Sequence, residues 1–318
     1  MSAVIPSPVK NSFKIVEAPC PLCGAKTPRP LLQELEDVED RSPGHYTISR
    51  CEQCRLVYLS RRPAAECLAQ CYPAHYHVLD PARKSFVPRI LYGLRLRDRY
   101  RRLRGVVPRD CHAILEIGCG DGRFLALLDQ RMPSECQLTG VDLQVLPVSS
   151  GLHSRVRVIK GEFEAISLPF RYDLVVMYNV LEHVADPVAV LKKVGTQLHP
   201  GGVLIAETSN WDSLWRKAFP RHWQGLQVPR HQTHFELGSL RHTFDAAGYS
   251  VLRERYVYDP GDLSVTLCNW IVDRLKLRTP PRQVWFYFPV VLMSAPVVWM
   301  GNLLSRGSGA IEFVAQKR

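Results

Sequence analysis

The stretch of sequence that decides the fold reads Leu115-Glu116-Ile117-Gly118-Cys119-Gly120-Asp121-Gly122. The apolar run Ala113–Ile117 predicts a buried strand, and Phe124–Gln130 predicts a helix that opens after the glycines. A glycine-rich turn between a strand and a helix lets the backbone approach a nucleotide closely, because no side chain intrudes. The spacing is Gly-x-Gly-x-Gly rather than the Gly-x-Gly-x-x-Gly of pyrophosphate binders, and the acid Glu116 precedes it. This tighter form favours a ligand without a phosphate.

A second feature of the predicted nucleotide site is Asp142, which lies twenty residues after Gly122 at the end of the predicted strand Gln137–Asp142. An acid at this position can accept hydrogen bonds from both hydroxyls of a ribose, whichever nucleoside is bound. The loop and the acid, each next to a predicted strand, together predict a nucleoside cofactor.

Short apolar runs and helical patterns alternate through the rest of this region. Strands alternating with helices of this length form a mainly parallel sheet with helices on both faces. We therefore predict an α/β fold with a doubly wound, mainly parallel, seven-stranded Rossmann-like sheet. The predicted strands are Ala113–Ile117, Gln137–Asp142, Val156–Lys160, Tyr172–Tyr178, Val203–Glu207, Tyr249–Tyr256 and Ala310–Ala315, and the predicted helices include Phe124–Gln130, Pro187–Leu198 and Glu236–Ala247.

Several motifs in the right order resemble those of class I S-adenosylmethionine-dependent methyltransferases, over about 145 residues from Ala113 to Val257. The run Leu115–Leu125 is similar to the first motif of that family, and Asp142 is similar to its ribose-binding acid. The run Asp173–Pro187 resembles the fourth motif, and Leu198–Val203 resembles the turn that follows it. The resemblance implies that S-adenosylmethionine is the nucleoside cofactor.

The resemblance also implies which residues contact the cofactor. Gly161–Glu164 through Leu168–Phe170 is similar to the segment that borders the adenine, with Glu162 and Phe163 at the matching positions. The full implied cofactor set is Glu116, Gly118, Cys119, Gly120, Gly122, Asp142, Leu143, Glu162, Phe163, Tyr178 and Asn179.

One departure concerns the acceptor. Many nucleobase N-methyltransferases carry Asn/Asp-Pro-Pro followed by an aromatic residue, whereas Tyr178-Asn179-Val180 occupies the comparable region here. An exocyclic amine of a nucleobase is therefore a less favoured acceptor, while other nucleic-acid targets stay open.

Two Cys-x-x-Cys pairs precede the predicted sheet: Cys20 with Cys23, and Cys51 with Cys54, with 27 residues between the pairs. Such pairs predict four thiolates around one tetrahedral Zn²⁺. Short β-like runs between and after the pairs favour a zinc ribbon. Since four protein ligands leave no open coordination position, we expect a structural metal that stabilises a module too small to fold alone. The N-terminal part is also similar to a bacterial methyltransferase subgroup with such a ribbon, often associated with polysaccharide, lipid or secondary-metabolite pathways.

Positive charge is concentrated before the predicted sheet. The net charge of the 318-residue chain is +11, and between Arg83 and Arg109 ten Arg or Lys stand against the single acid Asp98. The segment Arg89–Arg104 predicts a basic amphipathic helix, with Leu91, Leu94, Leu96, Tyr100 and Leu103 near one stripe and arginines on the other faces. Two interpretations remain open: a surface that attracts anions such as lipid headgroups, phosphorylated substrates or nucleic acid, and a solvated helix face.

An apolar segment, Gln283–Ser305, carries no charge and is flanked by Arg282 and Arg306. It is almost long enough to cross a bilayer, but Pro289 and Pro296 interrupt it. Aromatic residues at both ends suit a membrane interface, so we favour a segment that dips into one leaflet. The alternative is a helical pair packed on the domain or on a second subunit of a homo-oligomer.

Methyl transfer from a sulfonium needs alignment of the reactants and a deprotonated acceptor. Three histidines are candidates for the base that deprotonates the acceptor. His183 lies just beyond the fourth predicted strand, near where the methyl group should point, and His231 and His234 lie on a predicted loop before the last helix, where the resemblance places acceptor contacts. An ordinary histidine pKa suits proton removal near neutrality. For His183 we favour hydrogen bonding within the loop; for His231 and His234 that role and catalysis both stay open. Trp211, Trp215 and Trp223 could wall an apolar acceptor pocket or pack in the core.

The leading hypothesis is a methyltransferase acting on oxygen or carbon of a small-molecule, glycan or lipid-linked acceptor. The alternatives are an RNA methyltransferase that uses the ribbon and the arginine helix to bind phosphates, and a non-catalytic binding scaffold. The N-terminal residues lack the apolar core of a secretory signal, so we expect a cytoplasmic protein, peripheral on the inner face of the membrane. The predicted division of the chain is tail 1–16, zinc ribbon 17–62, helical linker 63–110, cofactor domain 111–258, apolar insertion 259–308 and final strand 309–318.

Overall fold

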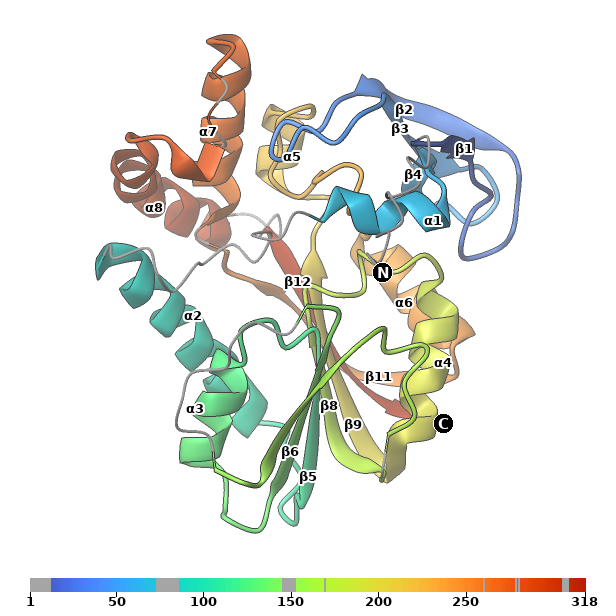
Figure 1. The fold of residues 1–318 in the computed structure, drawn as a ribbon, viewed down its shortest axis with the longest axis vertical. Helices are drawn as coiled ribbons and strands as arrows, with labels where there is room; N and C mark the ends of the chain where they lie inside the picture. Colours follow the sequence, from blue (N-terminus) through green and yellow to red (C-terminus); the bar gives the residue numbers. More distant parts are fainter. Residues whose placement is uncertain are drawn as a thin grey trace, which may run out of the picture.

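Figure 1 shows a computed structural model of the chain, which describes residues 13–72, 86–144, 153–168, 170–259, 261–277, 279, 281–304 and 309–318. Within these ranges the side chains of 86–91, 283 and 302–304 are not described. Most of the predicted tail, the predicted linker between 73 and 85, and Ser305 at the end of the apolar segment lie outside the described residues.

The larger sheet has seven strands in the order β11-β12-β9-β8-β5-β6-β7. Strand β12 runs antiparallel to both of its neighbours, and the other pairs are parallel. The predicted α/β, mainly parallel, seven-stranded sheet is therefore confirmed. The strands are β5 (Ala113–Ile117), β6 (Gln137–Asp142), β7 (Val156–Lys160), β8 (Tyr172–Tyr178), β9 (Leu198–Ser209), β11 (Tyr249–Val257) and β12 (Ala310–Lys317).

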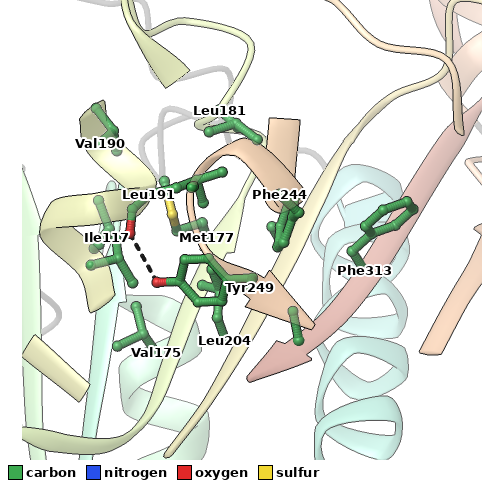
Figure 2. Packing of buried hydrophobic residues seen from close by; sticks show 14 of the residues in the cluster. Ile117, Val175, Met177, Leu181, Val190, Leu191, Leu204, Phe244, Tyr249 and Phe313 are labelled. Atoms are coloured by element: carbon green, nitrogen blue, oxygen red, sulfur yellow. Dashed lines mark hydrogen bonds between the residues drawn. The ribbon is translucent and has the colours of Figure 1, made fainter. Parts of the chain in front are cut away.

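Helices cover both faces of this sheet, because successive residues of its buried strands point to opposite sides. On one face Leu115 and Val175 join the core formed with α4 (Pro187–Gln197) and α6 (Leu237–Ala246). Figure 2 shows this core, where the hydroxyl of Tyr249 donates to the carbonyl of Leu191 at 2.9 Å. On the other face Ile114 and Leu174 pack with α3 (Arg123–Arg131) and α2 (Phe86–Arg104).

Strand β9 begins earlier than predicted. The sequence suggested a turn at 199–202 between helix and strand, whereas β9 starts at Leu198, directly after α4 ends at Gln197. Leu198 already pairs with Tyr172 of β8, and the register shifts before Leu174 pairs with Val203. The additional pairing satisfies backbone groups that a free turn would leave to water.

The amphipathic pattern predicted for the arginine-rich helix is partly wrong. Helix α2 exists, and Leu96 and Leu103 are buried as expected, but Leu94 is half exposed. Arg99 and Arg102 instead face the sheet, where they reach Glu207. The buried carboxylate attracts arginines to a helix face that hydrophobicity alone would assign to leucines.

A second sheet forms the N-terminal module, which we define as residues 13–63. Its strands are β1 (Ile15–Glu17), β2 (Pro28–Leu35), β3 (Tyr46–Cys51) and β4 (Val57–Pro63), in the order β1-β4-β3-β2. A short helix α1 (Ala65–Leu68) and a 3-10 turn (Ala69–Cys71) follow. A fifth strand, β10 (Thr233–His234), pairs with β4 although it lies far away in sequence. The predicted loop that carries His234 is thus partly a strand of the N-terminal sheet, because β4 offers it an edge to pair with.

The predicted insertion contains α7 (Gly261–Arg274), a 3-10 turn (Pro281–Gln283) and α8 (Tyr287–Leu304), which Figure 1 shows projecting beside the N-terminal module. The expectation that prolines break the apolar segment is wrong. Pro289 falls in the first turn of α8, where its missing N–H costs nothing, and Pro296 is accommodated inside the helix. Among the described helices, none combines the length and apolar character needed to span a bilayer.

Candidate functional site

The glycine loop after β5 adopts a backbone that only glycine accepts without strain. Gly118, Gly120 and Gly122 have φ angles of 76°, 53° and 71°, all in the left-handed region. A Cβ on Gly118 would also overlap the side chain of Val180, which follows β8. The loop therefore bends tightly at the end of β5 and packs closely against the residues that follow β8.

Asp142 is held against this loop. The amide of Gly120 donates to Oδ2 of Asp142 at 2.8 Å, and the amide of Gln144 donates to Oδ1 at 2.9 Å. The amide of Gly118 donates to the carbonyl of Val141 at 2.8 Å, which ties the loop to the end of β6. The structure thus brings together the two features from which the sequence predicted a nucleoside site.

Glu116 lies at the base of the loop and is 4 % exposed. Its Oε2 has no hydrogen-bond partner among the residues that the structure describes. Burial raises the pKa of this carboxyl well above its usual value. An approaching positive charge would stabilise the carboxylate form, so the loop suits a cationic ligand.

The other residues of the implied cofactor set differ in accessibility. Leu143 and Glu162 are exposed beside the loop, whereas Cys119 and Phe163 are buried. Tyr178 is also buried, with its ring edge-on to Phe124 at 5.3 Å between centroids. Their contacts with a cofactor stay predictions.

Asn179 connects the end of β8 to helix α2. Its Oδ1 accepts hydrogen bonds from Arg95 at 3.1 Å and Arg99 at 2.8 Å, and its Nδ2 donates to Glu182 at 3.3 Å. Arg99 also donates to Glu207 at 2.8 Å. Sequence analysis missed Glu207, although an acid inside the apolar run of β9 was the signal that could have found it.

The three predicted histidines lie together at the end of β8. The rings of His183 and His231 are edge-on with centroids 4.5 Å apart, and His234 lies 6.2 Å from His231. Nδ1 of His231 is 2.8 Å from the carbonyl oxygen of Gly225, so it must donate and Nε2 carries the lone pair. Nδ1 of His183 lies 3.2 Å from the hydroxyl of Tyr72.

Burial keeps these histidines neutral. It lowers the pKa of His183 and of His234 to about 3, and the charge of Arg230 adds to the effect at His183. Burial, with the neighbouring histidines, lowers the pKa of His231 well below its usual value. The expectation of an ordinary histidine pKa is therefore wrong, because burial disfavours the charged form; the free-base imidazole predominates at neutral pH and is a weaker base than an exposed histidine.

Strand pairing and an ion pair hold residues 230–234, which we call the histidine segment, against the N-terminal module. The backbone of His234 pairs with Val57, and the amide of Leu59 donates to the carbonyl of Gln232 at 2.9 Å. Fully buried Arg230 forms an ion pair with Asp37, with nitrogen–oxygen distances of 2.8 and 2.9 Å. The module therefore helps to fix where His231 and His234 lie.

The three tryptophans follow the predicted core-packing alternative. Trp211 and Trp223 are buried in the core that the N-terminal module shares with the loops after β9, and Trp215 packs against that core. The ring of Trp211 also lies 5.2 Å from that of His234, so this core borders the histidines.

The four predicted zinc ligands converge. Sγ atoms of Cys20 and Cys54 are 3.4 Å apart, and those of Cys23 and Cys51 are 3.5 Å apart. A tetrahedral zinc–thiolate site needs sulfur separations of about 3.8 Å, from zinc–sulfur bonds of about 2.3 Å. All four sulfurs lie within 4.8 Å of one another. The arrangement is compatible with a bound Zn²⁺.

Burial would raise the pKa of the Cys51 thiol, but backbone N–H groups of Cys54 and Gln53, with the Cys23 side chain, lower it to about 7. Burial instead raises the pKa of the Cys20 thiol, to about 11, and that of the Cys54 thiol, so the convergence of the four sulfurs carries the metal assignment. Within the described residues, Glu182, His183 and His231 form a second group whose ligand atoms lie within 4.8 Å of one another. Glu182 there already accepts from Thr208 at 2.8 Å.

Comparisons with known proteins find similarity to methyltransferases. A family model described as "Methyltransferase domain" matches residues 89–254. The ubiquinone biosynthesis O-methyltransferase of Stutzerimonas stutzeri (strain A1501) is 34% identical over 105 residues, covering 30% of this chain and 44% of that protein. The protein of the same name from Nitrosospira multiformis is 32% identical over 143 residues, covering 42% and 52%.

The chain therefore spans about half the length of the curated relatives it matches. Among solved structures, "StiE O-MT residues 961-1257" superposes with a TM-score of 0.50 at 17% identity, over 74% of this chain and 78% of that one. Likeness at that identity supports the fold alone.

Proposed function

This chain belongs to the methyltransferase family whose domain model matches residues 89–254, and we propose that it methylates an oxygen atom of a small-molecule acceptor. The match confirms the expected methyltransferase family, and we propose S-adenosylmethionine as its methyl donor. The similar ubiquinone biosynthesis enzymes are named O-methyltransferases, which supports oxygen as the acceptor atom.

One observation carries the cofactor half of the proposal. The amide of Gly120 meets the Asp142 carboxylate at 2.8 Å, within a turn whose three glycines have left-handed backbones. An acid held there can bind ribose hydroxyls, and buried Glu116 can face a positively charged cofactor such as a sulfonium. S-adenosylmethionine combines these two features.

The histidine cluster supports the acceptor half. When the acceptor oxygen attacks the methyl carbon, the sulfur–carbon bond breaks, and the hydroxyl proton must leave. We assign proton removal to Nε2 of His231, because the Gly225 carbonyl fixes its proton on Nδ1, although burial makes this imidazole a weaker base than an exposed histidine. His183 and His234 border it, and we assign them roles in positioning His231 rather than in taking the proton.

We also propose that Cys20, Cys23, Cys51 and Cys54 hold a structural Zn²⁺. Four thiolates complete a tetrahedral zinc shell and leave no position for a substrate. The metal would then act on the reaction only through the fold of the module, whose strand β4 pairs with the histidine segment.

We do not favour the RNA alternative. It relied on the arginine-rich helix to bind phosphates, yet Arg95, Arg99 and Arg102 are ion-paired with Glu207. Arg97, Arg101 and Arg104 remain exposed on the outer side of α2. Half of the six arginines from 95 to 104 are thus used within the fold, and we favour a small-molecule acceptor over a nucleic acid.

We retain a membrane contact as part of this proposal. Large apolar side chains are exposed over the α7–α8 hairpin, including Trp285 at 87 % and Met293 at 77 %. Trp285 lies just before α8 and Trp299 in its second half, while exposed Arg274 ends α7 and Lys276, which pairs with Asp273 at 3.0 Å, follows it. Aromatic residues near cations suit a lipid interface, so we assign this face to one leaflet rather than to a second subunit.

The acceptor is tested by incubating the full chain with methyl-labelled S-adenosylmethionine and extracts or a panel of phenols, sugars and lipid-linked alcohols. We expect label in an ether-linked methyl group. His231→Gln should reduce kcat more than a hundredfold while cofactor affinity changes less than about twofold. Absence of labelled product with every acceptor would contradict the proposed O-methylation, and full activity of His231→Gln would contradict the role of His231 as the base.

The membrane contact is tested by flotation with phosphatidylglycerol vesicles. Wild type should float with the vesicles, and the double variant Trp285→Ser/Trp299→Ser should remain at the bottom. Leu252→Ser, an exposed apolar residue on β11, serves as the matched control and should float. A wild-type protein that stays at the bottom but elutes as a dimer would favour the homo-oligomer instead.

A further inference from the structure

A groove lies between the N-terminal module and the segment around α5 (Leu214–Ala218). Its volume is about 430 Å³, within the range of about 300–1,000 Å³ usual for small-molecule sites. Figure 1 shows α5 beside β2 and β3 of the module, whose residues form the opposite wall. Four of the lining residues are arginines: Arg29, Arg50, Arg55 and Arg216.

We propose that this groove binds a phosphate or diphosphate group. The proposal goes beyond the methyl transfer described above and does not depend on it.

Two of the arginines are fixed in position. Arg50 is bidentate to Glu236, at 2.6 and 3.3 Å, and its side chain is 15 % exposed. Nε of Arg216 donates to the carbonyl of Trp211 at 2.8 Å, and its guanidinium lies 4.7 Å from the centre of the Trp211 ring. Arginines held in this way lose little conformational entropy when they bind an anion.

The charges of the other two arginines are not neutralised by any carboxylate of the described residues. Arg29 and Arg55 are exposed, and no carboxylate of the described residues lies within ion-pairing distance of either. Glu236 is the carboxylate that contacts an arginine of the groove, and Asp212, which is near Arg216, is ion-paired with Lys217 at 2.7 Å. The groove therefore carries excess positive charge.

The chemistry of the lining favours phosphate over other anions. Guanidinium groups match two phosphate oxygens at once, and a phosphate monoester carries almost two negative charges at neutral pH, more than one carboxylate. Leu31, Leu32 and Trp211 provide apolar walls between the arginines. These walls suit an ester whose remainder is apolar or planar, such as a nucleotide, a sugar nucleotide or a lipid phosphate.

The test is calorimetric titration of the full-length, zinc-supplied protein with inorganic pyrophosphate. We expect saturable binding that weakens more than tenfold in Arg29→Gln/Arg55→Gln, because each substitution removes a charge-assisted hydrogen bond to the phosphate. The control Arg97→Gln/Arg101→Gln removes the same charge from exposed positions on α2 and should bind like wild type. Absence of saturable binding, or equal weakening in the control, would overturn the proposal.

A second arm distinguishes the two sources of phosphate. If Arg29→Gln/Arg55→Gln also abolishes cosedimentation with phosphatidylglycerol vesicles, the ligand is a lipid phosphate. If only pyrophosphate binding is lost, the ligand is a soluble phosphate ester. S-adenosylmethionine affinity should be equal in all variants, so failure of this site is separable from failure of the proposed methyl transfer.

Discussion

Glu207 and Glu312 lie directly opposite each other on the neighbouring strands β9 and β12, and each is 1 % exposed. Like charges in such a pair repel, and burial makes the repulsion costly. Arg102 relieves it by bridging both carboxylates, at 2.6 Å to Glu207 and 2.8 Å to Glu312. Burial would raise the pKa of Glu207, but the charges of Arg99, Arg102 and Arg95 hold it well below its usual value.

This arrangement predicts that α2 is required for stability. Arg102→Met should lower the free energy of unfolding by about 3–5 kcal/mol, because it leaves two buried carboxylates with less compensation. Urea unfolding measures the change. Arg104→Met, at an exposed position of the same helix, should change stability by less than about 0.5 kcal/mol. Adding Glu312→Gln to Arg102→Met should recover part of the loss, and no recovery would count against the bridging role.

The glycine loop predicts that a change in its backbone weakens cofactor binding. Gly118→Ala should weaken S-adenosylmethionine binding at least tenfold, because Gly118 has a left-handed backbone and its new Cβ would overlap Val180. Calorimetry measures the affinity. The control Gly238→Ala lies in α6 with open space around the new Cβ and should leave binding unchanged. Wild-type affinity in Gly118→Ala would show that the loop does not hold the cofactor.

Asp262 predicts a pH dependence of stability. Burial, followed by the charge of Asp259, raises the pKa of Asp262 to about 7, against about 3.9 in the unfolded chain. The folded state therefore holds a proton that the unfolded state releases, and stability falls as pH rises from about 4 to about 7. Asp262→Asn should remove this fall, which we expect to be on the order of a few kcal/mol.

The measurement is urea unfolding of both proteins at pH 5 and pH 8. Asp212→Asn, at a surface ion pair with Lys217, is the control and should keep the wild-type difference between the two pH values. An unchanged difference in Asp262→Asn would assign the pH dependence to other groups.

The N-terminal module predicts a selective effect of metal removal. Chelation of Zn²⁺, or Cys23→Ser, should reduce methyl transfer more than tenfold, because strand β4 would no longer hold β10 and the histidines beside it. Cofactor affinity should fall by less than about threefold, since the glycine loop belongs to the other sheet. A chelator should have no further effect on Cys23→Ser. Equal loss of cofactor binding and turnover would indicate general unfolding instead.

Much of the large sheet was predictable because its signals are local. The strands Gln137–Asp142, Val156–Lys160 and Tyr172–Tyr178 have the predicted limits, since each is a short apolar run bounded by turn residues. Helix α7 was missed because polar and apolar residues share its buried face; Asp262, for example, is buried against Ser213 and Trp223. Helix α5 was missed because its five residues are too few to show a helical period, and none of them is buried.

The histidine segment could not be assigned from its own residues. Pairing of β10 with β4 brings together positions more than 170 residues apart, such as His234 and Val57, and no local pattern of two residues identifies a strand. The role of the α2 arginines could not be assigned locally either, because their partners Glu207 and Glu312 lie on β9 and β12, more than 100 residues further along the chain.

By itself the sequence determined the glycine loop, Asp142 and the pattern of strands around them, and with these the methyltransferase fold, since each depends on neighbouring residues and backbone conformation. The four cysteines were likewise evident from spacing, and the structure places their sulfurs within 4.8 Å of one another. Only the tertiary structure decided that the arginine helix neutralises two buried acids, and that the N-terminal sheet includes the histidine segment. Both depend on long-range contacts, whose free energy comes from burying charges and backbone groups that are distant along the chain.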